Sequence, residues 1–248
     1  MCIFTLQRNN LVQKLPICQI RIDFDEFSLA PPINGRCGDQ TDSFILSGAT
    51  NFNSSGLPNT GLCGELTGQH VYVDVDPEDT TEPLLFIINT SNEEVYNRKW
   101  SIRIRQIPCH SQYKAVPGCL QTYSGIEGVI ESLNYRGIPR GINVAGYPSN
   151  NRPAPFPMNA GDSPNYFNNL NYGVCIMLAN GYCGIKYEAT EFDFGGTLAG
   201  QSCVGSNAIN QCYCTIVDSQ QDEGDYLTIV GGSTDGFTLL QNQFCGQR

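Results

Sequence analysis

The strongest signal along the chain is an alternation of apolar and polar residues with a period of two, which is typical of β-strands with one buried face. In the first such segment, Ile20, Ile22 and Phe24 share one face. Phe27 and Leu29 resume the pattern after a slip of one residue, which indicates a β-bulge. Further strands are predicted at residues 71–75, 84–88 and 100–107.

The last of these segments shows two faces of different character. Apolar and polar side chains alternate along it, as Trp100, Ser101, Ile102, Arg103, Ile104 and Arg105. This suits a sheet with one dry face and one wet face. The predicted strands are separated by turn clusters rich in Gly, Asn, Ser and Pro, and no convincing helical pattern occurs. The chain is therefore predicted to be all-β and built from antiparallel β-sandwiches.

A cysteine pattern occurs twice along the chain. Each time a cysteine-bounded apolar hairpin leads into an alternating strand, and the pattern closes with a Cys-Gly pair, Cys63-Gly64 in the first pass and Cys245-Gly246 in the second. A repeat of this length predicts two copies of one small β domain, each stapled by disulfides. We expect these domains at residues 1–108 and 109–248. The pattern points toward binding and away from catalysis.

The cysteine count bears on the compartment. Twelve cysteines, an even number, occur without any CxxC pair and with only two histidines, which disfavours zinc and iron–sulfur sites and favours disulfides in a secreted protein. The sequence begins at Met1 and Cys2 without the leader that a secreted protein is expected to have. The first copy continues with strand-like sequence after its Cys-Gly pair, whereas the second copy stops there. We therefore expect the sequence to be a fragment, with the signal peptide not present in it.

The charge distribution bears on partners. The formal net charge is −10, and no basic cluster is longer than Arg98-Lys99. Nucleic acids and anionic membranes need a basic footprint, so neither is an expected partner. No apolar stretch approaches the ~20 residues that span a bilayer.

Catalytic motifs are not found. Neither His70 nor His110 lies in an HExxH or GxSxG context, and His70 is expected to begin a strand. Carboxylate neighbours such as Asp23 and Asp25 are interpreted as solvated strand positions, because acid–base catalysis needs two carboxylates across a cleft. We expect no catalytic residues and no enzymatic activity. Two N-glycosylation tripeptides begin at Asn53 and Asn89.

Several segments resemble CUB domains, which are extracellular β-sandwiches. The similar segments are residues 128–135 (GVIESLNY), 225–229 (DYLTI) and 244–246 (FCG) in the second copy, and 20–27, 42–46, 62–64 and 100–104 in the first. The runs ICQIRIDF at 17–24 and GCLQTY at 118–123 are most similar to paired CUB-type domains of arthropod secreted proteins. The resemblance implies two jelly-roll-like sandwiches, the first without its opening strand and the second without its closing strands.

The resemblance also implies a function. We expect a non-catalytic extracellular protein that recognises a protein or a glycan through its loops. The first loops to test are residues 76–83, residues 92–98 and a Pro- and Asn-rich excursion at 138–171. Two alternatives stay open: the non-catalytic CUB region of a larger secreted protease, and an extracellular structural subunit that assembles with copies of itself.

The resemblance suggests disulfide pairings. Cys37 with Cys63 and Cys214 with Cys245 would match the family's second bridge, and Cys2 and Cys18 then remain in the first copy, pairing across a hairpin near residues 9–10. By the repeat, Cys109 would pair with Cys119, Cys175 with Cys183, and Cys203 with Cys212. However, a tight turn at residues 180–181 places Leu178 opposite Cys183. The family's usual first bridge joins Cys119 to Cys175 instead, so these alternatives stay open.

CUB domains often bind calcium through one Glu and two Asp, because Ca²⁺ takes about six to eight oxygen ligands. The Asp that the family places directly before its D-x-L strand is present, as Asp42 in the first copy and as Asp225 in the second. The position expected for the Glu falls near Ala30 in the first copy, and the third position falls near Asn89. The resemblance therefore implies that calcium binding is weak or lost. Asp42 and Asp225 are the remaining metal candidates, and no other cofactor is expected.

Overall fold

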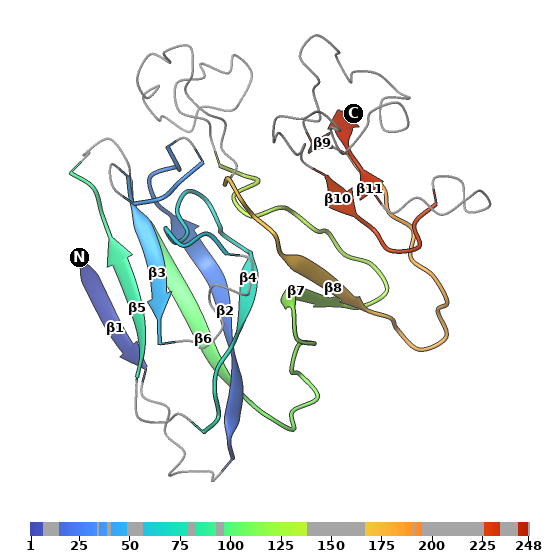
Figure 1. Ribbon diagram of the computed structural model, residues 1–248, viewed down its shortest axis with the longest axis horizontal. Coiled ribbons are helices and arrows are strands. Elements are labelled where there is room, and N and C mark those ends of the chain that lie inside the picture. The colour runs from blue at the N-terminus through green and yellow to red at the C-terminus, as the bar shows by residue number, and fades with distance from the viewer. Residues whose placement is uncertain are drawn as a thin grey trace, which may run out of the picture. The chain divides into compact units, whose positions relative to one another are not determined.

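The structure is a computed structural model. It describes residues 1–6, 15–33, 35–38, 41–48, 57–78, 83–92, 97–137, 167–190, 192–194, 226–233 and 243–247. Every regular element among these residues is a strand, which confirms the all-β class (Figure 1). The strands are β1 (Cys2–Leu6), β2 (Ile17–Ser28), β3 (Ser43–Ser47), β4 (His70–Asp74), β5 (Leu84–Asn89), β6 (Lys99–Pro108), β7 (Cys119–Ser124), β8 (Gly173–Met177), β9 (Asp193–Phe194), β10 (Leu227–Thr228), β11 (Gln243–Phe244) and β12 (Gly246–Gln247).

The chain forms two compact units, Met1–Tyr182 and Cys183–Arg248. The expected domain boundary after Pro108 stays a prediction. β7, β8 and the described residues between them belong to the first compact unit, together with the N-terminal sandwich.

The N-terminal unit contains a β-sandwich of two three-stranded sheets. One has the order β1-β5-β3 and the other β4-β2-β6, and every pairing within them is antiparallel (Figure 1). Apolar side chains from both sheets fill the space between the layers. Among the largest fully buried ones are Ile20, Ile22, Phe24, Phe27, Phe44, Leu84 and Ile88.

The central strand β2 confirms the alternation and the bulge that the sequence predicts. Ile20, Ile22 and Phe24 are at most 1 % exposed. The register against β6 shifts between Phe24 and Glu26, and this shift returns Phe27 to the core. Phe24 and Phe27 then lie edge to face, with ring centroids 4.9 Å apart.

The edge strand β6 has the two faces that the sequence predicts. Ile102 and Ile104 are half-buried and pack against the core, whereas Arg103 and Arg105 are exposed. The Arg103 guanidinium lies 2.7 Å from the Asp25 carboxylate on β2. Because this ion pair is exposed, its contribution to stability is small.

The segment after Pro108 folds back over the outer face of the β4-β2-β6 sheet. The buried Gln19 side chain holds it there, because its Oε1 accepts a hydrogen bond from Ala115 N at 2.8 Å and its Nε2 donates one to Asp74 Oδ1 at 2.8 Å. β7 then continues beside β4 and pairs with β8 in parallel, the one parallel pairing among the described strands.

Residues of β7 and of the segment that follows it complete the core of the N-terminal sandwich. Leu120, Leu133 and Phe167 are at most 4 % exposed and belong to the same apolar cluster as the strands of both sheets. Asn134 adds a polar contact, because its Oδ1 accepts a hydrogen bond from Glu65 N at 2.7 Å. This part of the chain is therefore integral to the N-terminal unit.

Three disulfides join described cysteines: Cys18 with Cys109, Cys37 with Cys63, and Cys119 with Cys175. The second is the pair that the CUB resemblance implies, and the third is the alternative that the family's first bridge suggests. The first and third show that three expected pairings are wrong, namely Cys2 with Cys18, Cys109 with Cys119, and Cys175 with Cys183.

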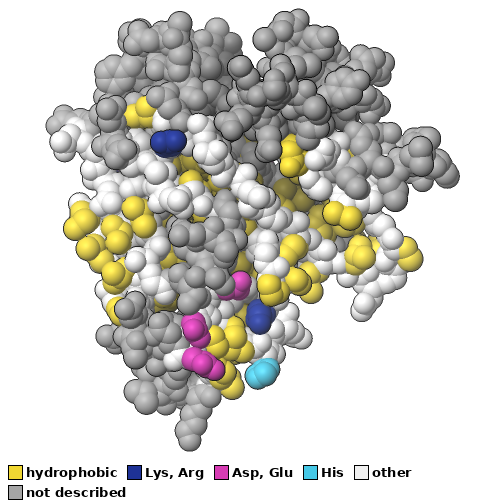
Figure 2. Space-filling view, viewed as in Figure 1, with side chains coloured by type: hydrophobic (Ala, Val, Ile, Leu, Met, Phe, Trp, Pro, Cys, Tyr) yellow, Lys and Arg dark blue, Asp and Glu magenta, His cyan; other side chains and the backbone are white. Residues whose placement is uncertain are grey.

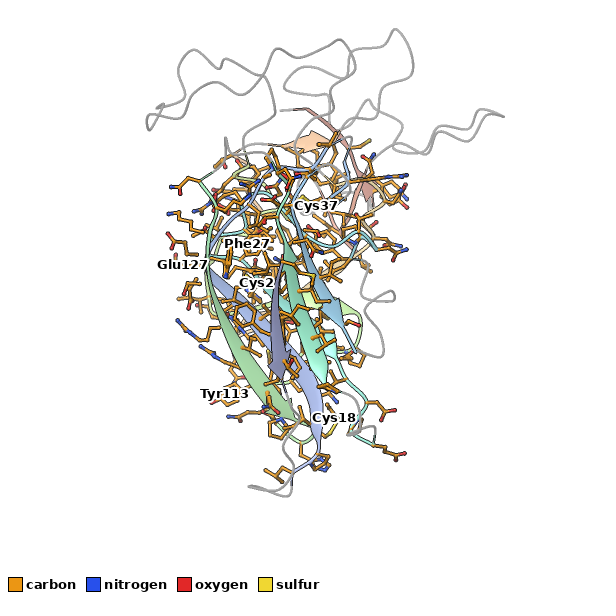
Figure 3. The ribbon with its side chains drawn as sticks, turned by 90° about the vertical axis from the view of Figure 1, so that its left-hand side faces the viewer. Cys2, Cys18, Phe27, Cys37, Tyr113 and Glu127 are labelled. Carbon is orange, nitrogen blue, oxygen red and sulfur yellow. A yellow bond between two sulfur atoms is a disulfide. The ribbon has the colours of Figure 1, made fainter. Side chains whose placement is uncertain are left out.

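The reason for the first error is topological. β1 does not form a hairpin with β2 but pairs with β5 in the opposite sheet, so Cys2 and Cys18 lie far apart along the sandwich (Figure 3). Cys2 and Cys183, expected in disulfides, are free and exposed. The turn at residues 180–181 is present, with Tyr182 N donating to Ala179 O at 3.2 Å, and Cys175 is bonded to Cys119 and not to Cys183.

The C-terminal unit contains two short antiparallel pairs, β9 with β12 and β10 with β11. Cys245 lies between β11 and β12, is fully buried and is disulfide-bonded. The expected pairings of Cys214 with Cys245 and of Cys203 with Cys212 involve residues outside the described part of the chain.

Candidate functional site

The Asp42 carboxylate is the most completely buried acidic group among the described residues. Asp42 immediately precedes β3 and is fully buried. Ala30 N donates to its Oδ2 at 2.8 Å, and Ser91 N donates to its Oδ1 at 2.8 Å. Arg98 Nε donates to Oδ2 at 2.7 Å. Both carboxylate oxygens are therefore engaged, by donors from three separate segments of the chain.

The Arg98 guanidinium is held by more than the carboxylate. Its Nη2 donates to Ser91 O at 3.3 Å and to Ser91 Oγ at 3.1 Å. The Arg98 side chain is only 17 % exposed. One carboxylate oxygen, one carbonyl oxygen and one hydroxyl oxygen thus surround this cation.

The pKa of Asp42 reflects two opposing effects. Burial raises the pKa, but the Arg98 guanidinium and the two backbone N–H donors outweigh it, so that the pKa of Asp42 lies below its ordinary value. The carboxylate stays ionised at neutral pH, and the ion pair with Arg98 is complete there.

Asn89 is another sequence candidate that the structure places at this site. Asn89 ends β5 beside Asp42, is partly exposed, and donates from Nδ2 to Ser43 Oγ at 3.4 Å. Asn53 and Asp225 lie outside the described residues. Glycosylation of Asn53 and Asn89 stays a prediction.

The two histidines occupy unrelated positions. His70 begins β4, as predicted, and its Nε2 lies 3.0 Å from Thr122 O on β7. Burial, together with the Arg21 charge, lowers the pKa of His70 below its ordinary value. His110 lies in an exposed turn. Among the described residues, no three His, Cys, Asp or Glu side chains are grouped closely enough to hold a metal ion.

Exposed apolar side chains gather where β7 and β8 end, a feature that the sequence reasoning missed. Because the two strands are parallel, with Ser124 opposite Met177, the chain leaves both of them at the same end. We call the side chains there the exit surface: Ile126, Val129, Met177, Leu178 and Tyr182, each between 53 % and 75 % exposed. The apolar letters of residues 126–130 were available in the sequence, but nothing in their local pattern shows that they are exposed.

The first loops selected from sequence are only partly described. Residues 76–78, 83, 92, 97 and 98 are described, as are residues 167–171 at the end of the Pro-rich excursion. Within this set Phe167 is buried in the core. In the described part of the chain there is no helix that is both long and apolar enough to cross a membrane.

These features define a disulfide-stapled antiparallel β-sandwich protein of the kind found outside the cell. The animal CUB domain model matches residues 116–248, and the chain belongs to this family. CUB domains are non-catalytic extracellular binding modules, so the chain contains a module of that kind. No curated protein and no solved structure matches the chain.

Proposed function

We propose that this protein is an extracellular, non-catalytic binding protein whose CUB module presents the exit surface to a protein partner. The observation that carries the proposal is the gathering of five exposed apolar side chains at one end of the parallel strand pair. Exposed apolar clusters of this kind mark interaction sites, and Met and Tyr are enriched in protein interfaces. Aliphatic side chains favour a protein over a glycan as the partner.

The scaffold suits this role because it is fixed covalently. Cys119 and Cys175 join the two strands from which the exposed segments leave. A disulfide limits the relative movement of those strands, so less conformational freedom is lost when a partner binds. Figure 2 shows apolar side chains exposed on one face of the molecule.

We also propose that the two segments 1–108 and 109–248 are CUB-like copies in tandem, most similar to paired arthropod domains. The N-terminal sandwich supports this proposal through the Cys37–Cys63 disulfide and through Asp42 immediately before β3. Secretion is part of the same proposal, because twelve cysteines suit an oxidising compartment.

Site-specific cross-linking tests the proposed surface. A photo-reactive amino acid replaces Leu178 in the full chain, and the protein is exposed to the extracellular fluid of its source tissue. The matched control carries the same group at Tyr113, which is 74 % exposed, precedes β7 and is not part of the exit surface.

The expected result is one discrete cross-linked polypeptide from position 178 and none from position 113. Adding Val129→Asp should abolish that product and leave the melting temperature unchanged, because Val129 is 75 % exposed. Equal products from both positions would contradict the proposal, as would a product that is insensitive to Val129→Asp.

Self-association is a second candidate function, favoured by the edge strand β1. Among the described strands β1 is the outermost of its sheet, and its apolar Ile3 and Phe4 are 51 % and 52 % exposed. An open apolar edge can pair with the same strand of a second copy. Light scattering over a range of concentrations tests this: a mass that rises with concentration and falls in Phe4→Lys supports it, and a monomer throughout excludes it.

A further inference from the structure

The calcium ligands that the CUB resemblance implies do not fit the N-terminal sandwich. Ala30, where the Glu is expected, offers no carboxylate, and Asn89, near the third position, offers a neutral amide that donates to Ser43. Asp42 supplies one carboxylate, and three donors already occupy its two oxygens. Ca²⁺ needs about six to eight oxygen ligands, several of them charged, so this donor set is inadequate.

We propose that the Arg98 guanidinium takes the position of the metal ion in this sandwich, as a permanent internal cation that makes this end of the fold independent of calcium. The contacts of Arg98 support this role. Its donors reach a carboxylate oxygen of Asp42 and two oxygens of Ser91, which are the oxygen types that a hard cation binds.

The arrangement of the chain explains what the internal cation accomplishes. Asp42 precedes β3, Ser91 follows β5, and Arg98 precedes β6, so the cation joins the ends of strands from both sheets. Among the described residues at this cluster, its charge of +1 faces the single carboxylate of Asp42 and balances that charge. A calcium ion added beside Arg98 would meet an unfavourable like charge in a largely buried setting.

The test uses the full chain and measures the melting temperature with about 5 mM calcium chloride and with an equal concentration of EDTA, since millimolar calcium fills the weakest extracellular sites. The Asp225→Asn variant serves as the background, so that the candidate in the second copy does not contribute. The expected result is the same melting temperature in both solutions. A calcium-dependent increase that disappears in Asp42→Asn would overturn the proposal.

Two variants of Arg98 separate the charge from the shape of the side chain. Arg98→Gln removes the cation and should lower the melting temperature by roughly 10 °C, because it leaves a buried carboxylate without its charge partner. Arg98→Lys keeps a cation and should lower it by less than half as much. Equal losses in the two variants would show that Arg98 acts through packing alone. The outcome is independent of which partner the exit surface binds.

Discussion

Leu133 lies in the segment matched by the CUB domain, yet its side chain is 2 % exposed within the core of the N-terminal sandwich. If that packing holds in solution, shortening Leu133 must destabilise strands that precede it by many residues. The change to test is Leu133→Ala in the full chain.

The magnitude follows from burial. A fully buried Leu→Ala change costs about 2–5 kcal/mol, because transfer free energy is lost and a cavity remains. We expect about 3 kcal/mol, since the surrounding strands are cross-linked and relax little. With a urea dependence of about 2–3 kcal/mol per molar for a unit of this size, the unfolding midpoint should fall by about 1 M.

Trp100 provides the assay. It is the single tryptophan of the chain, lies on β6, and packs against the N-terminal core. Its fluorescence therefore reports on the sandwich and not on the segment that carries Leu133. The matched control is Val129→Ala in the same segment, where a 75 % exposed side chain should change stability by less than about 0.5 kcal/mol.

One result would refute the reasoning. If Leu133→Ala leaves the Trp100-monitored midpoint at the wild-type value while far-ultraviolet circular dichroism shows a second, earlier transition, the segment folds separately from the sandwich. The expected result is a single transition, shifted equally by both probes.

The remaining predictions concern titration, backbone strain and a disulfide. The free energy of unfolding of the wild-type protein should fall as the pH drops below about 6.5. Below that pH the histidine takes up a proton in the unfolded chain, whereas the lowered pKa of buried His70 keeps it neutral in the folded protein. Urea titrations at several pH values should show a weaker pH dependence in His70→Gln. Gly61 and Gly68 have similar positive φ angles, +85° and +83°. A Cβ at Gly61 would lie 2.5 Å from the backbone oxygen of Phe44, whereas a Cβ at Gly68 would meet no atom within 4 Å. Gly61→Ala should therefore lower the melting temperature more than Gly68→Ala. Replacing Cys18 and Cys109 together by Ser should cost about 2–5 kcal/mol in denaturant unfolding.

Each of these predictions has a contrary outcome. An unchanged pH slope in His70→Gln would remove that histidine as its source. Equal losses in Gly61→Ala and Gly68→Ala would mean that steric overlap adds nothing to left-handed strain. A peptide map of the unreduced protein in which Cys18 is linked to Cys2 would contradict the disulfide topology.

The strands could be predicted from sequence wherever one face is buried. In β2 and β6 the apolar residues alternate because the core takes one face and solvent the other, so Ile20, Ile22 and the slip before Phe27 were all predictable. These patterns depend on local periodicity, which the sequence shows directly.

Contacts between distant segments could not be predicted in the same way. Cys2 and Cys18 suggested a hairpin because they are near in sequence, but β1 pairs with β5 across the chain. At the candidate site, a family motif identified Asp42. Its partner Arg98 lies 56 residues further along the chain, and no motif around Arg98 indicates that it pairs with Asp42. Similarly, nothing in the local pattern of Ile126, Val129 and Ile130 distinguishes exposure from burial.

The Cys18–Cys109 disulfide has a mechanical consequence. It spans 91 residues and joins the start of β2 to the end of β6, where these antiparallel neighbours meet. A pulling force applied to the two ends of the chain would pass through the sulfur atoms and bypass strands β3, β4 and β5. Such tension would therefore extend the residues outside this covalent loop without being transmitted through β3, β4 and β5.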